Sequence, residues 1–434
     1  MNMPVVGYAG MTHLGLNSAA AAAARGFNTV CYDPDAALIA RLESGQFPVV
    51  EPGLEELIAA NRERLTFTAS SADLARCALT YVAIDVPTDD RGESDLGPVR
   101  SLIADVSARL TPEGLLVILC QVPPGFTRTL PWPKQRLYYQ VETLVFGRAV
   151  ERATQPERFI VGCAEPEKPL PASLATFLQS FGCPILPMRY ESAELAKIAI
   201  NCCLVASVTV ANTLAELSER IGADWHEIVP ALKLDRRIGQ HSYLAPGLGL
   251  AGGNLERDLA TVLALASETG AEAGLIRSFV RNSRHRKDWV LRTLHRELLD
   301  VHEDPVIAVL GLAYKENTHS TKNSASLALL AQLQPWKVRV HDPVVPASSV
   351  LHPAKIGCRT AMEAVQGADA LLLMTPWAEY RGLEVSALEK SMRGRLIIDP
   401  YRLFDARGAK AAGFDYLTLG MPAVHAAQGG SEDA

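Results

Sequence analysis

The stretch that decides the fold is residues 3–33, MPVVGYAGMTHLGLNSAAAAAARGFNTVCYD. Residues 3–9 form a short apolar run typical of a buried strand, and residues 16–25 are alanine-rich, as helices often are. Residues 28–32 form a second apolar run that ends in an acid. A strand, turn, helix and strand in this order predict the opening of a parallel α/β sheet.

The turn in this unit carries a degenerate dinucleotide fingerprint. Gly10 and Gly15 bracket it, and Thr12 stands where the second glycine of G-x-G-x-x-G belongs. That glycine normally lets the backbone approach a pyrophosphate, so Thr12 either moves the phosphates outward or donates a hydrogen bond to one. Asp33, at the end of the second strand, is placed to accept from both ribose hydroxyls, which favours NAD over NADP. The alternative is a domain of this fold that has lost its cofactor.

The rest of the chain extends this pattern into a second α/β unit. The strands expected after the first two are residues 79–84, 115–119, 159–161, 306–310, 338–341, 370–374 and 396–398. Residues 192–221 form one long helical pattern that is apolar on more than one face, and residues 255–299 form a second helical block. A helix apolar nearly all round is buried between domains or against another subunit. We therefore predict an α/β fold with two Rossmann-like doubly wound domains joined by a central helical dimerisation region.

Composition limits the possible partners. The chain has 434 residues, a net charge of -6, 48% hydrophobic and 21% charged residues. This charge gives no electrostatic reason to expect nucleic acid or an anionic membrane. We expect no signal peptide in residues 1–9 and no apolar run of about 18 residues that would span a membrane. The eight cysteines are scattered without metal-ligand spacing, so we expect free thiols in a reducing cytoplasm and no metal site.

Several motifs together resemble the UDP-glucose/GDP-mannose dehydrogenase family over roughly residues 3–420. The most specific are SGQFPVVEPGLEEL (44–57), AIDVPTDDRGESD (83–95), ELAKIAIN (194–201), YLAPGLGLAGGNLERD (243–258) and GLAYKENTHSTK (311–322). The resemblance implies an NAD-binding domain in residues 1–190, a helical dimerisation region in 191–300 and a nucleotide-sugar-binding domain in 301–425. Residues 426–434 are small and polar, and we expect a disordered tail there.

The resemblance also implies catalytic roles. Lys197 and Asn201 lie one helical turn apart, so both can face one site. In the family the lysine stabilises negative charge on the reacting sugar oxygen, and the asparagine positions that oxygen or a water. Asp258 corresponds to the carboxylate that activates water or takes the hydroxyl proton. Glu142 aligns with the glutamate of the family's PEFLxEG segment.

Further residues are carried over as binding residues. Val86 stands where a family threonine touches the cofactor, Gln121 lies in a turn resembling STVPPGTTR, and Lys322 takes the place of an arginine at the nicotinamide end. Lys315 resembles a lysine that holds the nucleotide diphosphate, and Arg237 resembles an arginine that reaches the sugar of the neighbouring subunit. The remaining candidate substrate-binding residues in matching segments are Leu144, Tyr243 and Gly249.

Simpler interpretations than a functional role remain open for Lys197, Asp258, Asn254 and His13. Lys197 could be a solvated helix charge, and Asp258 could cap the following helix. Asn254 could be a loop residue with a left-handed backbone, and His13 could be a contact at the start of the first helix.

The departures from the family pattern gather at the expected site. Asn254 replaces the cysteine that captures the intermediate aldehyde, and an asparagine has no nucleophilic side chain. Phe146 replaces a glutamate, and Arg257 replaces the lysine beside Asp258. We therefore expect altered chemistry rather than a decayed enzyme.

The resulting hypothesis is a homodimeric, cytoplasmic, NAD-dependent nucleotide-sugar dehydrogenase of the UDP-glucose 6-dehydrogenase type. It acts on a UDP-sugar, or a GDP-sugar, and stops after one oxidation because Asn254 replaces the cysteine. A second oxidation through a water adduct held by asparagines stays open. The alternative is a catalytically silent nucleotide-sugar-binding protein. A hydroxyisobutyrate-type dehydrogenase would lack the second α/β unit.

Overall fold

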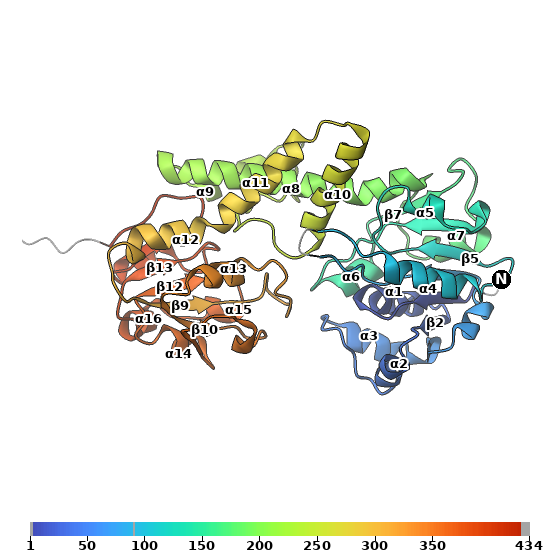
Figure 1. The fold of residues 1–434 in the computed structure, drawn as a ribbon, viewed down its shortest axis with the longest axis horizontal. Helices are drawn as coiled ribbons and strands as arrows, with labels where there is room; N and C mark the ends of the chain where they lie inside the picture. The colour runs from blue at the N-terminus through green and yellow to red at the C-terminus, as the bar shows by residue number, and fades with distance from the viewer. Residues whose placement is uncertain (1–2, 90–91, 427–434) are drawn as a thin grey trace, which may run out of the picture. The chain divides into compact units, whose positions relative to one another are not determined.

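A computed structural model describes residues 3–89 and 92–426 of the chain. The chain divides into two compact units, Met1–Ile200 and Asn201–Ala434, called here the first and the second unit (Figure 1). Most of the expected tail, and residues 90–91 of the motif at 83–95, lie outside the described residues.

The first unit is built on an eight-stranded sheet of order β3-β2-β1-β4-β5-β6-β7-β8. Its first six strands are parallel, and β7 pairs with β6 in antiparallel fashion. The strand order reverses between β1 and β4, the switch point at which doubly wound sheets bind ligands. The strands are β1 (Val6–Ala9), β2 (Thr29–Tyr32), β3 (Leu65–Thr68), β4 (Leu79–Val82), β5 (Leu115–Ile118), β6 (Leu137–Gln140), β7 (Phe159–Cys163) and β8 (Ile185–Arg189).

Helices cover both faces of this sheet, and each face has its own apolar core (Figure 1). One core contains the alanines of α1 with side chains of α2, α3 and α7. The other contains side chains of α4 and α5 and the first turn of α8. The helices are α1 (His13–Ala24), α2 (Ala36–Glu43), α3 (Leu54–Ala60), α4 (Gly97–Ser107), α5 (Phe126–Thr129), α6 (Ala149–Thr154) and α7 (Ala172–Gln179), with 3-10 turns at Arg62–Arg64, Ser71–Arg76 and Lys134–Arg136.

Helix α8 (Tyr190–Ile221) ends the first unit and begins the second. Its mean hydropathy reaches 1.8 over a window of which one third is buried, so by length and composition it could cross a membrane. The sequence predicted this long apolar helix over residues 192–221, but it predicted no apolar run long enough to span a membrane. A single helix of this kind does not distinguish a membrane span from a helix packed in a core or an interface.

The helices of the second unit pack on the second half of α8. One apolar cluster joins Val205 of α8 with Leu250, Leu259 and Phe279, and another joins Ala211 and Ala215 with Trp225 and Leu244. The helices are α9 (Trp225–Leu234), α10 (Asn254–Thr269), α11 (Gly274–Lys287) and α12 (Trp289–Leu294), followed by a π-helical turn at His295–Leu299.

A second, six-stranded parallel sheet of order β11-β10-β9-β12-β13-β14 completes the second unit. Its order also reverses beside the first strand, between β9 and β12, as expected for a second Rossmann-like domain. Its elements are β9 (Val306–Leu310), α13 (Ala325–Gln332), β10 (Lys337–His341), a 3-10 turn (Ala347–Ser349), β11 (Lys355–Gly357), α14 (Ala361–Val365), β12 (Ala370–Leu373), α15 (Ala378–Arg381), α16 (Val385–Ser391), β13 (Leu396–Ile398), α17 (Ala406–Ala411) and β14 (Asp415–Leu417).

The predicted fold class, with two Rossmann-like α/β domains and a helical region between them, is confirmed. One local prediction was wrong. Gly15 does not end the first turn; it lies inside α1, which begins at His13 instead of residue 16. The domain boundaries and the dimerisation role stay predictions.

Candidate functional site

Glycine is required at two positions of the turn between β1 and α1. Gly10 has a φ of +96°, and a Cβ there would lie 1.9 Å from Cγ2 of Ile84. A Cβ on Gly15 would lie 1.7 Å from the carbonyl oxygen of Gly10. The turn is therefore packed against both the loop after β4 and the first turn of α1, as a phosphate-binding turn requires.

Thr12 is the N-cap of α1, although its side chain does not cap the helix. Its hydroxyl oxygen instead accepts a hydrogen bond from the backbone N–H of Asp85, at 3.1 Å. This bond leaves the hydroxyl proton to be donated elsewhere, which suits the expected contact with a phosphate. Val86 is buried in the core beside α4, and Gln121 is half-buried after β5.

Asp33 retains acceptor capacity for a ribose. Its carboxylate accepts from the N–H of Met11 at 2.8 Å and of Asp35 at 3.0 Å. These are its two donors among residues 3–89 and 92–426. A carboxylate offers about four lone-pair positions, so about two remain for the ribose hydroxyls.

The matching acid of the second sheet, Asp342, is saturated. Its Oδ2 accepts from the N–H groups of Leu312 and Ala313 and from Nε1 of Trp377, at 2.6, 3.0 and 3.0 Å. Its Oδ1 accepts two further backbone N–H groups, from Val344 and Val345. Five donors fill the carboxylate. Of these two matching acids, Asp33 and not Asp342 has acceptor capacity left for a ribose diol.

Glu142 and Lys197 form a partly buried ion pair in the first unit, with Nζ and Oε2 3.2 Å apart. The other oxygen of Glu142 accepts from the N–H of Leu144, which closes a tight turn. A solvated helix charge is thus the wrong interpretation of Lys197, whose side chain is 11% exposed.

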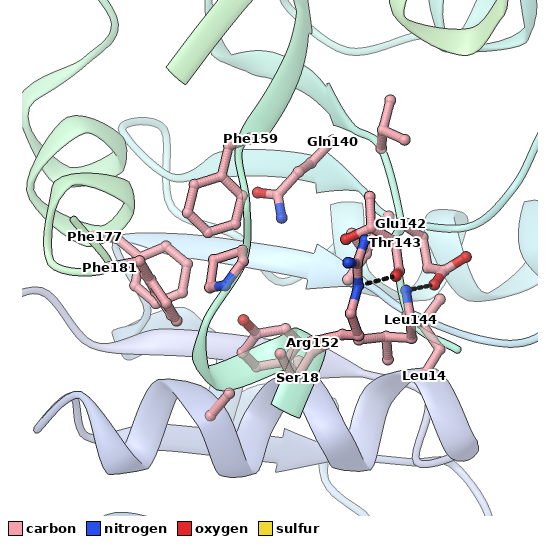
Figure 2. A pocket seen from close by; sticks show the side chains of 16 residues that line it. Leu14, Ser18, Gln140, Glu142, Thr143, Leu144, Arg152, Phe159, Phe177 and Phe181 are labelled. Carbon is pink, nitrogen blue, oxygen red and sulfur yellow. Dashed lines mark hydrogen bonds between the residues drawn. The ribbon is translucent and has the colours of Figure 1, made fainter. Parts of the chain in front are cut away.

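Figure 2 shows that Glu142, Thr143 and Leu144 line one side of a small cavity in the first unit, opposite Phe159 and Phe177. The Nε–H of Arg152 donates to the carbonyl oxygen of Thr143 at 3.3 Å. This contact supports the backbone of the segment that carries Glu142.

In the second unit, Asn201 and Asp258 form a buried pair. Nδ2 of Asn201 donates to Oδ2 of Asp258 at 2.5 Å, and Nε of Arg257 lies 3.5 Å from Oδ1. Asp258 is 1% exposed and is the fifth residue of α10, whose N-cap is Gly253. It does not cap the helix, so the simpler interpretation of this acid is wrong. The buried carboxylate is thus held in place by a neutral amide and a guanidinium.

The loop before α10 docks on the loop between β9 and α13. The N–H of Gly252 donates to the carbonyl oxygen of Lys322 at 2.9 Å, and Nδ2 of Asn323 donates to the carbonyl oxygen of Gly252 at 2.7 Å. Gly249 has a φ of +77°, and a Cβ there would lie 2.4 Å from the carbonyl oxygen of Ser283. Candidate residues from two distant parts of the sequence thus share one surface.

Asn254 is the first residue of α10 and is exposed. It is not among the residues with positive φ, so a left-handed loop backbone is the wrong interpretation. The first backbone hydrogen bond of the helix runs from the N–H of Arg257 to the carbonyl oxygen of Gly253. The N–H groups at the start of α10 therefore surround the Asn254 position with positive partial charge.

Three substrate candidates lie on loops of the second unit. Arg237 pairs with Asp235, at 2.6 Å, and its side chain is 89% exposed. Tyr243 is 52% exposed. Lys315 is half-buried with its ammonium 5.7 Å from the ring centre of Tyr314, which packs on Gly252. The structure brings Lys315 to the glycine-rich loop but leaves Arg237 and Tyr243 on exposed loop positions.

Comparison with known proteins places the chain in a family. Profiles of the UDP-glucose/GDP-mannose dehydrogenase family match in order: its NAD binding domain over residues 1–175, its central domain over 191–284 and its UDP binding domain over 308–406. UDP-glucose 6-dehydrogenase of Pseudomonas aeruginosa is 30% identical, and the alignment covers 95% of this chain and 96% of that relative. The chain belongs to the UDP-glucose/GDP-mannose dehydrogenase family.

Other members of the family agree with this assignment. UDP-glucose 6-dehydrogenase TuaD of Bacillus subtilis is 28% identical over 97% of this chain and 94% of its own length. The structure of a UDP-glucose dehydrogenase from Pyrobaculum islandicum superimposes with a TM-score of 0.84, at 25% identity, over 94% of this chain and 96% of that one. The protein is accordingly an NAD-dependent oxidoreductase of the nucleotide-sugar dehydrogenase family.

Two acids of family motifs acquire roles that the sequence did not show. Glu194, the first residue of the ELAKIAIN motif, is fully buried and accepts from the N–H groups of Gly125 and Thr127. Burial raises the pKa of its carboxyl. Glu51, in the EPGLEEL motif, pairs with His13. The motif matches identified the segments that contain these two acids. They did not reveal the hydrogen bonds, because the bonded residues are 38 to 98 positions apart in the sequence.

Proposed function

We propose that the protein oxidises a hydroxyl of a UDP-sugar with NAD and stops after one oxidation, at the aldehyde or ketone. The observation that carries the proposal is Asn254 at the first position of α10, where the family has its nucleophilic cysteine. An amide cannot form a thiohemiacetal, so an aldehyde is not held covalently for a second hydride transfer.

Asp258 takes the proton of the sugar hydroxyl. Its carboxylate is buried and is held in one orientation by Asn201 and Arg257, so it would accept the proton from a substrate hydroxyl in a defined position. Asn201 keeps the carboxylate in place, and its amide is placed to position the reacting oxygen or a water.

Lys197 stabilises negative charge that develops on the reacting oxygen. Its pair with Glu142 keeps the ammonium in a fixed position before substrate arrives. Glu142 and Leu144 in turn belong to the tight turn that would contact the sugar.

The cofactor assignment rests on the first unit. NAD, when bound, supplies the hydride acceptor. Gly10 and Gly15 form the close turn for the pyrophosphate, and Asp33 holds acceptor positions for the ribose. Thr12, Val86, Gln121 and Lys322 are proposed to complete the cofactor contacts.

The nucleotide of the substrate is proposed to bind the second unit, where Lys315 would contact the diphosphate. Arg237, Tyr243 and Gly249 are proposed as further substrate-binding residues. The similar relatives named above are UDP-glucose dehydrogenases, which favours uridine over guanosine.

We further propose a cytoplasmic homodimer formed through α8. Exposed apolar side chains follow one another at helical spacing along its last turns, at Val210, Leu214, Leu217 and Ile221. Such a stripe is stabilised when a second copy covers it. Light scattering on the purified protein gives the mass that tests this.

The test of the function is NADH formation with UDP-glucose and a panel of UDP- and GDP-sugars, together with trapping of a carbonyl product by hydroxylamine. One NADH per sugar and a trapped product support the proposal. Nucleotide binding without NADH from any sugar would favour the silent-binding alternative.

A further inference from the structure

His13 and Glu51 form a buried pair at the start of α1. Nε2 of His13 lies 2.9 Å from Oε2 of Glu51, and the two residues are 7% and 6% exposed. An ionised carboxylate only accepts, so the imidazole donates its Nε2–H. The proposed function uses neither residue.

Besides His13, Glu51 also contacts the backbone of residues 147–149. Its Oε2 accepts from the N–H of Gly147 at 3.0 Å, and its Oε1 accepts from the N–H of Ala149 at 2.7 Å. Ala149 is the first residue of α6, and both α6 and α3 pack on α1. One carboxylate therefore joins the cofactor turn to the segment 142–149.

A ring contact reinforces this connection. The ring of Phe146 stacks on His13, with centroids 4.0 Å apart and planes inclined by 24°. Phe146 is 40% exposed and covers the buried imidazole. Phe146 is also the position at which the chain departs from the family's glutamate.

The connected segment carries two proposed site residues. Glu142 and Leu144 lie four and two residues before Phe146, and their tight turn lines the cavity in Figure 2. His13 occupies the first turn of α1, where the N–H groups of a helix receive an anionic ligand. A movement of this turn displaces His13 and, through it, the segment 142–149, because a buried hydrogen-bonded pair is costly to separate.

We propose that His13, Glu51 and Phe146 are positioning residues that couple cofactor binding at the β1–α1 turn to the placement of Glu142 and Leu144. This inference rests on the proposed function for the roles of Glu142 and Leu144. The coupling itself is a property of the first unit and is measurable without catalysis.

The test is amide hydrogen exchange of peptides covering residues 142–150, with and without NAD, in the full-length protein. The variants are His13→Ala, His13→Gln and Phe146→Leu. Glutamine carries its Nε2 donor at a similar reach without the ring or a charge. The control is His352→Ala, which removes another buried histidine, one that hydrogen-bonds the carbonyl oxygen of Leu333 in the second unit.

In the wild-type protein we expect NAD to slow exchange of residues 142–150. His13→Ala speeds their exchange at least about tenfold and abolishes the effect of NAD, because the amides of Gly147 and Ala149 lose an anchored acceptor. His13→Gln restores much of the protection, and Phe146→Leu gives an intermediate loss. His352→Ala lowers the melting temperature but leaves exchange of 142–150 and its response to NAD unchanged.

Two results would overturn the inference: equal exchange of 142–150 in His13→Ala and His352→Ala, or no response of this segment to NAD in the wild type. A wild type whose segment responds to NAD but which forms no NADH with any sugar would sink the proposed function and leave the coupling standing. NADH formation by a wild type whose residues 142–150 do not respond to NAD would overturn the coupling and leave the proposed function standing.

Discussion

Replacing Asn254 with cysteine restores the nucleophile that the family uses, at a position suited to a thiolate. The residue opens α10, a helix of 16 residues whose first N–H groups have no acceptor within the helix. A negative charge at a helix N-terminus gains about 0.3–1 kcal/mol. At about 1.36 kcal/mol per pKa unit, this lowers the thiol pKa by roughly 0.2–0.7 from about 8.5.

The expected change in the thiol is measurable. At pH 8.5 the thiolate fraction rises from about 50% to about 60–80%, so a cysteine here reacts faster with iodoacetamide than an ordinary surface thiol. The same alkylation measured on the parent protein is subtracted, to correct for the reaction of the exposed Cys203. With a nucleophile present, Asn254→Cys is expected to yield two NADH per nucleotide sugar and a uronic acid. Asn254→Ser, whose hydroxyl is not activated, is expected to keep a yield of one NADH per nucleotide sugar.

The contrary result is a variant whose new thiol is alkylated readily and whose single oxidation remains intact, but which still forms only one NADH per nucleotide sugar. The missing thiol would then not be what limits the reaction.

Four further predictions follow from single contacts. Asp33→Ala raises the Kd for NAD, measured by calorimetry, by about 10–100-fold, because hydrogen bonding to a charged group contributes roughly 1.5–3 kcal/mol. The control Asp342→Ala leaves that Kd unchanged. Gly15→Ala places a Cβ 1.7 Å from the carbonyl oxygen of Gly10, so the melting temperature falls and NAD binding weakens; a wild-type Kd would contradict the close packing. Asn201→Leu leaves the buried Asp258 without its amide donor and costs about 1–3 kcal/mol in urea unfolding, with lower kcat; unchanged stability would argue against the pair. Burial raises the pKa of Glu194, so its contribution to the free energy of unfolding is present below its ordinary pKa of 4.5 and is lost as pH rises through the raised value. Glu194→Gln should flatten the loss measured from pH 4 to 7, and parallel curves for the two proteins would contradict it.

The sequence predicted most of the buried central strands because each is a continuous apolar run; the exception is β6, which is fully buried and ends in the polar Gln140. It missed β3, β6, β8, β11 and β14. Of these, β11 and β14 have only three residues, and β8 is largely exposed, so their patterns do not stand out. The sequence predicts Gly15 in a turn because glycine is a poor helix former. Its place inside α1 is set by a contact with Gly10 that only the folded turn creates.

The candidate site was predictable to the extent that its residues are neighbours in the sequence. Lys197 and Asn201 share a helix face, and the turn from Glu142 to Leu144 is local. The contacts that hold them are not local. Asn201 meets Asp258 from 57 positions away, and Glu51 meets Ala149 from 98. A motif identifies such residues, but only the tertiary structure shows which groups they pair with.

The most direct test of the central claim is the number of NADH molecules formed per nucleotide sugar consumed by the wild-type protein. The account predicts one, with a carbonyl product that hydroxylamine traps. Two NADH and a uronic acid would contradict it, because they would show that the protein completes both oxidations without a thiol at Asn254.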